Sequence, residues 1–187
     1  MGLPNATSIL TTLPGGIRAI VRRDSVVETC AVRTAISESG SLSLSGLERL
    51  AKINIWTLCA DFTPRVSVGD VLYVDGVPSF AVDVMTSCGN LISRANVVLC
   101  EDKVTIGDIE IPCQLGMVSQ DMAMGIDGFS PDDAQGFFVP ESIIPEGVEI
   151  STASPATISG KRLTVEKISR DAKYGILCVM CRRRGAE

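Results

Sequence analysis

The chain has 187 residues, of which 45% are hydrophobic and 4% aromatic, and it contains no histidine. This length suffices for one large domain or two small ones, with a core that must be mostly aliphatic. The net charge of −5 and the scarcity of aromatic side chains argue against a nucleic-acid reader, while no apolar run is long enough to span a membrane and no secretory signal is expected.

Short runs rich in β-branched residues, separated by Gly, Pro, Asn and Asp, dominate the chain and predict strands. They lie at residues 17–21, 71–74, 80–84, 96–99 and 176–180. Asp75-Gly76 stands between two of these runs and predicts a tight hairpin turn. Residues 45–52 place their apolar side chains on one helical face and predict a short helix. The fold class is therefore expected to be mainly β with little helix.

The chain also repeats itself, with one unit at about residues 17–100 and the other at about 109–184. Gly76 and Gly160 are 84 residues apart, and an apolar arm follows each, at 80–82 and 163–165, if a one-residue slip is allowed. We therefore expect two small β-barrel or sandwich modules in tandem, residues 1–101 and 102–187. Residues 101–103 would form a hydrophilic connector. The alternative is a coincidental similarity between two β-rich segments.

The residues that most catalytic and metal sites need are missing. Histidine is the commonest general base and metal ligand near neutral pH, so Ser–His and Cys–His mechanisms are excluded. Cys178 and Cys181 form a CxxC, but on a strand they would face opposite sides and could not hold one ion together. Gly160-Lys161 lacks the earlier glycine of a phosphate loop, and residues 127–133 lack the ligand spacing of a calcium loop. We predict no enzyme activity and no catalytic, cofactor-binding or metal-binding residues.

The seven cysteines are odd in number and lie in apolar contexts, which predicts reduced core thiols and synthesis in a reducing cytoplasm. They are Cys30, Cys59, Cys88, Cys100, Cys113, Cys178 and Cys181.

Charge is distributed unevenly along the second half of the chain. Residues 102–160 carry ten acidic residues and one basic residue, a net −9, whereas residues 161–187 carry eight basic and three acidic residues, a net +5. Two interpretations stay open: a solvated strand and tail, or complementary contacts between copies or with a neighbouring ring of subunits. Residues 34–46 and 119–136 are likewise either mobile surface loops or segments ordered by neighbouring subunits.

Residues 68–76, Val-Gly-Asp-Val-Leu-Tyr-Val-Asp-Gly, and the Phe-Ala-Val at 80–82 resemble a hairpin of the small β-barrel head–tail connector proteins of tailed bacteriophages. These proteins, called head-completion, stopper or joining proteins, have a Gly-Asp before a hydrophobic strand, an Asp-Gly turn and an x-Tyr/Phe-x-Val arm. Residues 144–147, 160–165 and the last strand resemble the C-terminal portion of the same family. Known relatives usually have one module, so a tandem departs from their pattern.

The resemblance implies a structural virion protein, made in the host cytoplasm, that forms a homo-oligomeric ring at the neck. Its partners would be copies of itself, the portal or adaptor, and tail proteins, with no membrane, while DNA passes without specific binding. The acidic stretch 102–160 would repel DNA phosphate, which suits such a channel.

Two alternatives remain open. One is another tail component, such as a terminator, tube or baseplate protein. The other is a Ser–Lys hydrolase of the repressor-cleavage and signal-peptidase type, which residues 69–75 also resemble. That family has a serine before the Gly-Asp and a lysine tens of residues later. Here residues 61–65 contain no serine, and Lys103 falls in the expected connector.

Overall fold

The computed structural model divides the chain into two compact units, one of Met1–Gly40 with Ala51–Leu99 and the other of Ser41–Leu50 with Cys100–Glu187. It describes the backbone at 16–23, 26–36, 42–44, 47–50, 53–58, 66–74, 76–87, 89, 92–118 and 134–183. The described side chains lie within 66–73, 76–86, 94–118 and 134–183.

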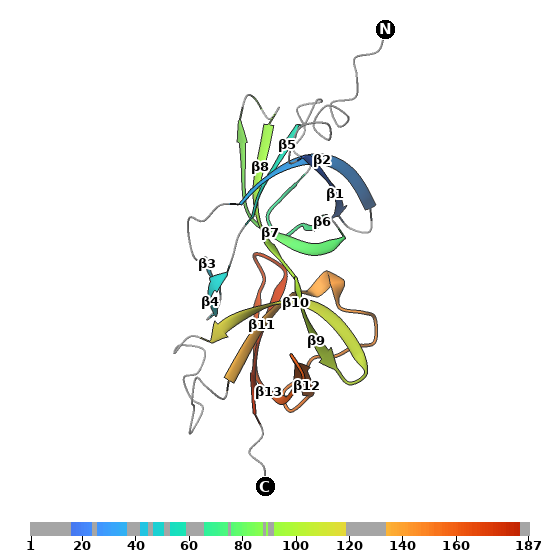
Figure 1. Ribbon diagram of the computed structural model, residues 1–187, viewed down its shortest axis with the longest axis vertical. Coiled ribbons are helices and arrows are strands. Elements are labelled where there is room, and N and C mark those ends of the chain that lie inside the picture. Colours follow the sequence, from blue (N-terminus) through green and yellow to red (C-terminus); the bar gives the residue numbers. More distant parts are fainter. Residues whose placement is uncertain are drawn as a thin grey trace. The chain divides into compact units, whose positions relative to one another are not determined.

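Six antiparallel strands of the first unit close into a ring, here called the first barrel (Figure 1, blue to green). They are β1 (Gly16–Arg23), β2 (Val26–Ile36), β5 (Ile53–Leu58), β6 (Val71–Val74), β7 (Val77–Ser87) and β8 (Ile92–Leu99). The ring order is β1-β2-β5-β8-β7-β6. Because β6 returns beside β1, the spatial order β6-β1-β2-β5 is a Greek key.

The second unit contains an eight-stranded sheet in which an additional β10–β11 pairing closes six strands into the second barrel (Figure 1, yellow-green to red). These are β9 (Asp102–Ile106), β10 (Ile109–Val118), β11 (Ala134–Pro140), β12 (Pro155–Ile158), β13 (Lys161–Asp171) and β14 (Ile176–Arg182). The ring order is β9-β10-β11-β14-β13-β12. When the six strands of each barrel are numbered by their order along the chain, both rings read 1-2-3-6-5-4.

These two rings confirm the expected mainly β fold with two barrel modules in tandem. Within the described part of the chain the only helix is the 3-10 turn η2 (Glu141–Ile143).

A hairpin of β3 (Leu42–Leu44) and β4 (Leu47–Leu50) completes the sheet of the second unit by pairing β4 with the end of β10. The helix predicted at residues 45–52 is therefore wrong. Short apolar stretches fit both periods, and here the pairing of Leu47 and Glu48 with β10 decides in favour of a strand. Residues 41–50 precede the expected module boundary in sequence, yet they belong to the second unit.

The start of the second repeat also needs correction. Residues 101–103 were expected to be a connector, and Ile109 to open the module. Instead Asp102 begins β9, whose Val104 and Ile106 pair with β10 on one side and β12 on the other. β9 is thus the counterpart of β1, and β10 the counterpart of β2.

An offset of 84 residues relates the last three strands of the two barrels without any slip. Register shifts occur in β7 between Ala81 and Asp83 and in β13 between Val165 and Lys167. Phe80 pairs with Val71 in one hairpin and Thr164 with Pro155 in the other. Phe80 therefore corresponds to Thr164, and the one-residue slip proposed from the sequence is wrong.

The interior of the second barrel is aliphatic apart from one aromatic ring and two thiols, as the composition predicted. Its buried members are Val104, Ile106, Ile111, Cys113, Phe137, Val139, Ala156, Ile158, Leu163, Val165, Val179 and Cys181. Burial of this apolar surface is the main favourable contribution to folding of the unit.

Candidate functional site

The hairpin that carries the family resemblance is β6–β7, and the turn predicted at Asp75-Gly76 is confirmed. Val74 pairs with Val77, and Gly76 has a φ of +83°, in the region that a Cβ disfavours. Val71, Leu72 and Phe80 are buried. Because Val71 and Leu72 are consecutive on β6 and face opposite sides, this hairpin is buried on both of its faces.

The Gly-Asp of the motif fastens the chain to β7 before β6 begins. The amide of Gly69 donates to the carbonyl of Ala81 at 2.8 Å, and the amide of Ala81 donates to the carbonyl of Asp70 at 2.9 Å. The Asp70 carboxylate also accepts a hydrogen bond from the amide of Ser67 at 2.7 Å. Gly69 has a φ of +85°, so its identity follows from the backbone conformation of this loop.

The second barrel makes the same loop from different residues. The amide of Ala153 donates to the carbonyl of Val165 at 2.8 Å, and the amide of Val165 donates to the carbonyl of Ser154 at 2.9 Å. The Ser154 hydroxyl accepts from the amide of Ser151 at 3.2 Å. Each position lies 84 residues after its counterpart, so the same backbone conformation and hydrogen bonds occur at equivalent positions of both barrels.

Gly160-Lys161, excluded as a phosphate loop from sequence, belongs to the corresponding β12–β13 turn. Ile158 pairs with Lys161 around Ser159 and Gly160, which have φ values of +49° and +76°. Positive φ at both central residues is the signature of a type I′ hairpin turn.

The described thiols are buried and free, as their apolar contexts predicted; they are Cys100, Cys113, Cys178 and Cys181. Burial, with a smaller contribution from Asp102, raises the pKa of Cys100 to about 12. Burial, with a smaller contribution from Glu166, raises the pKa of Cys181 to about 12. Burial followed by the nearby Cys100 raises the pKa of Cys113 still further. Because only the thiolate is a good nucleophile or metal ligand, the raised pKa values lower the expected reactivity of Cys100, Cys113 and Cys181.

The CxxC does not bring its two sulfur atoms to one side of the strand. Cys181 belongs to the interior cluster of the second barrel together with Val179. Cys178, although buried, is not in that cluster, as alternation along β14 requires. Among the described residues no group of three or more His, Cys, Asp or Glu side chains is arranged to hold a metal ion.

Several acidic residues of the −9 stretch have partners within their own unit. The Asp102 carboxylate accepts from the amide of Leu115 at 2.9 Å, and Glu110 pairs with Lys103 at 2.7 Å. Lys103 therefore lies on β9 in an ion pair rather than in a connector. Asp108, Glu146 and Glu149 are exposed. The surface available for complementary charge contacts is smaller than the sequence sum indicates.

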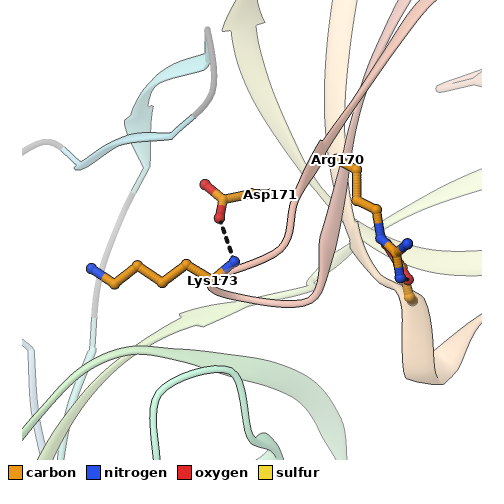
Figure 2. A network of polar contacts seen from close by, with 4 residues as sticks. Arg170, Asp171 and Lys173 are labelled. Carbon is orange, nitrogen blue, oxygen red and sulfur yellow. Dashed lines mark hydrogen bonds and ion pairs between the residues drawn. The ribbon is translucent and has the colours of Figure 1, made fainter.

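A second ion pair in the described residues joins Glu141 of η2 to Arg170 near the end of β13. Figure 2 shows Arg170 together with Asp171 and Lys173 of the turn that follows. The amide of Glu141 also donates to the carbonyl of Gly175 at 2.9 Å. In the turn itself, the amide of Lys173 donates to the Asp171 carboxylate at 3.0 Å. The Arg170 side chain is 68% exposed, so its ion pair is worth only about 0–1 kcal/mol. Together, the ion pair and the backbone hydrogen bond connect η2 to the end of β13 and the turn before β14.

No family model matches the chain, and no curated protein or solved structure is detectably similar to it. Among the described residues there is no helix with the length and hydropathy required to cross a membrane. The acidic stretch 127–133 and Cys30, Cys59 and Cys88 lie outside the residues whose side chains are described.

Proposed function

We propose that the protein is a structural virion subunit of a tailed phage, which forms a homo-oligomeric ring at the head–tail neck and joins the portal or adaptor to the tail. The observation that carries the proposal is the β6–β7 hairpin. Its Gly-Asp, Asp-Gly turn and Phe-Ala-Val arm resemble the connector hairpin, and Gly69 and Asp70 are fastened to β7 by a reciprocal pair of backbone hydrogen bonds.

The second barrel supports a scaffolding role. Its loop before β12 makes the same backbone hydrogen bonds as the loop before β6, although the residues differ. Rigid closed barrels leave few open sheet edges and present loops at fixed positions. Such a module suits a ring subunit that must bind neighbours above, below and beside it. The buried, free thiols described in the second unit agree with a mechanical role.

DNA would pass through the ring without specific binding. The net charge of −5 disfavours tight contact with phosphate, because non-specific affinity depends on Lys and Arg side chains that release counterions. Ion pairs within the second unit, such as Lys103 with Glu110, engage one of the few basic side chains near the acidic stretch. A channel of this character lets DNA slide.

Another tail component, a terminator, tube or baseplate protein, is the second candidate, since closed barrels of this size suit those positions equally. The Ser–Lys hydrolase is disfavoured by a specific contact. Its lysine must be available to activate a serine, whereas the Lys103 ammonium lies 2.7 Å from the Glu110 carboxylate. Lys103 also belongs to the second unit, while residues 69–75 belong to the first.

Negative-stain imaging and sedimentation of the purified protein test the proposal. We expect rings with a central channel, either alone or after addition of a phage portal or tail protein. Addition of the two neighbours separately distinguishes a neck protein, which binds the portal side, from a tube or baseplate protein, which does not. A protein that stays monomeric at high concentration with both neighbours present would overturn the structural assignment.

A further inference from the structure

The β3–β4 hairpin is inserted into the first barrel in sequence but completes the sheet of the second unit. β2 and β5, which flank it in sequence, are paired directly, with Ile36 opposite Ile53. The chain therefore leaves and re-enters the first barrel at adjacent positions. Residues 37–52 separate these positions in sequence, and Ser41–Leu50 among them belongs to the second unit.

β10 pairs with the hairpin through residues that follow the part of the strand used to close the barrel. β10 uses Ile109–Cys113 to pair with β9 and Gln114–Gly116 to pair with β11. Only Met117 and Val118 pair with β4, opposite Glu48 and Leu47. Ring closure of the second barrel thus requires no residue of the hairpin, and the acceptor can be vacated without opening the barrel.

We propose that this hairpin is exchanged between copies, so that in the assembled protein β4 of one copy pairs with the Met117–Val118 end of β10 in a second copy. The pairing of β4 with β10 identifies the segment that binds this strand edge. The β3–β4 hairpin of a second copy offers the same backbone groups in the same register. Met117 is 60% exposed, so the acceptor lies at the surface where another chain can reach it. This is strand addition at an available edge.

Two features favour exchange over closure within one chain. β4 and β5 are separated by only two residues in sequence, and short connections promote domain swapping. Donor and acceptor are also different surfaces, so one copy can give its hairpin to one neighbour and receive a hairpin from another; the exchange that we propose is this head-to-tail form. Such a contact generates a ring when its rotation closes. The ring assignment rests on the proposed function, whereas the exchange itself does not.

Cysteine cross-linking tests the exchange. Glu48→Cys and Met117→Cys are made as separate single variants, because their positions are direct partners in the register. The two proteins are unfolded, mixed, refolded together and oxidised. We expect a reducible covalent dimer that contains one copy of each variant. The matched control replaces Met117→Cys by Ile109→Cys, at the opposite end of β10 and 41% exposed, and should give no dimer beyond the wild-type background.

The double variant Glu48→Cys/Met117→Cys should form a ladder of covalent multimers under the same oxidation. If it instead closes within single chains and the mixed variants give only monomers, the exchange is wrong. Imaging separates this result from failure of the proposed function. Rings without cross-linked dimers would overturn the exchange alone, whereas cross-linked dimers in a protein that never forms rings would support the exchange and overturn the neck assignment.

Discussion

Before β6 the first barrel has Gly69-Asp70, and before β12 the second has Ala153-Ser154, yet both loops make the same backbone hydrogen bonds to β7 and β13. A carboxylate caps the first loop and a hydroxyl caps the second. The chain follows one path in both places, with φ near +85° at Gly69 and +71° at Ala153. Hydrogen bonding and turn geometry, rather than residue identity, define this repeat.

The difference continues into the strands. Phe80 of β7 is buried, while its counterpart Thr164 of β13 is only partly buried. In the second barrel the described aromatic side chain of the interior is Phe137 on β11. Leu163 and Val165, on either side of Thr164, belong to the interior cluster, so the position shared by Phe80 and Thr164 faces away from the barrel interior. The two barrels therefore differ in how the outer side of this strand is buried. Four substitutions or conditions test how far the two barrels are independent and equivalent.

The largest effect is expected from Phe137→Ala. Phe137 is fully buried in the second barrel, and its truncation should lower the free energy of unfolding by about 3–5 kcal/mol. The chain's single tryptophan, Trp56, lies on β5 and reports on the first barrel. We expect the Trp56 fluorescence transition to be unchanged, and the part of the circular-dichroism change that comes from the second barrel to move to lower temperature as a separate transition. The exposed substitution Lys161→Ala should change neither, and equal shifts of both signals would show that the barrels unfold as one.

Alkaline pH should weaken the second barrel through its buried thiols. The pKa values of Cys100 and Cys181 rise from 9.0 to about 12 on folding, so the unfolded chain loses these protons first. The contribution of these thiols to stability is intact below pH 9 and is lost as the pH rises from 9 toward 12. Thermal melts across this range check the slope. Because Lys and Tyr also titrate there, the decisive comparison is Cys100→Val/Cys181→Val, which should show a shallower decline. Parallel curves would contradict the prediction.

A structural feature could be predicted from the sequence where neighbouring residues determine it, and could not where pairing with a distant strand does. Asp75-Gly76 fixes its turn through its own backbone preferences, so the hairpin was predictable. The strand at Leu47–Leu50 was not, because only pairing with Met117 and Val118 distinguishes it from a helix. Ala153-Ser154 carries no trace of Gly69-Asp70, so the repeated loop was also missed. The apolar context of the described cysteines did predict their burial, since burial follows directly from hydropathy.

Gly76→Val and Gly160→Val should have matching effects on the two barrels. Both glycines have positive φ, at +83° and +76°, and open space surrounds the position of an added Cβ. Any destabilisation therefore comes from backbone strain alone, about 1–3 kcal/mol for each substitution. Trp56 fluorescence should report the first change and the circular-dichroism transition the second. An unchanged melting temperature for Gly76→Val would place the β6–β7 turn elsewhere.

The smallest change in stability is expected at Gly69 and Ala153, equivalent positions that share a positive φ but differ in residue type. Ala153 has a φ of +71°, a conformation that costs an alanine about 1–2 kcal/mol because of its Cβ. A glycine avoids this strain but loses more chain entropy on folding, which costs about 0.5–1 kcal/mol. Ala153→Gly should therefore stabilise the second barrel by about 0.5–1 kcal/mol, and Gly69→Ala should destabilise the first by a similar amount. Chemical denaturation of both variants measures the two changes on one scale. Opposite signs of equal size would establish that the loops are equivalent in energy as well as in hydrogen bonding. A loss of stability in Ala153→Gly would show that the Ala153 side chain contributes a contact that its counterpart in the first barrel lacks.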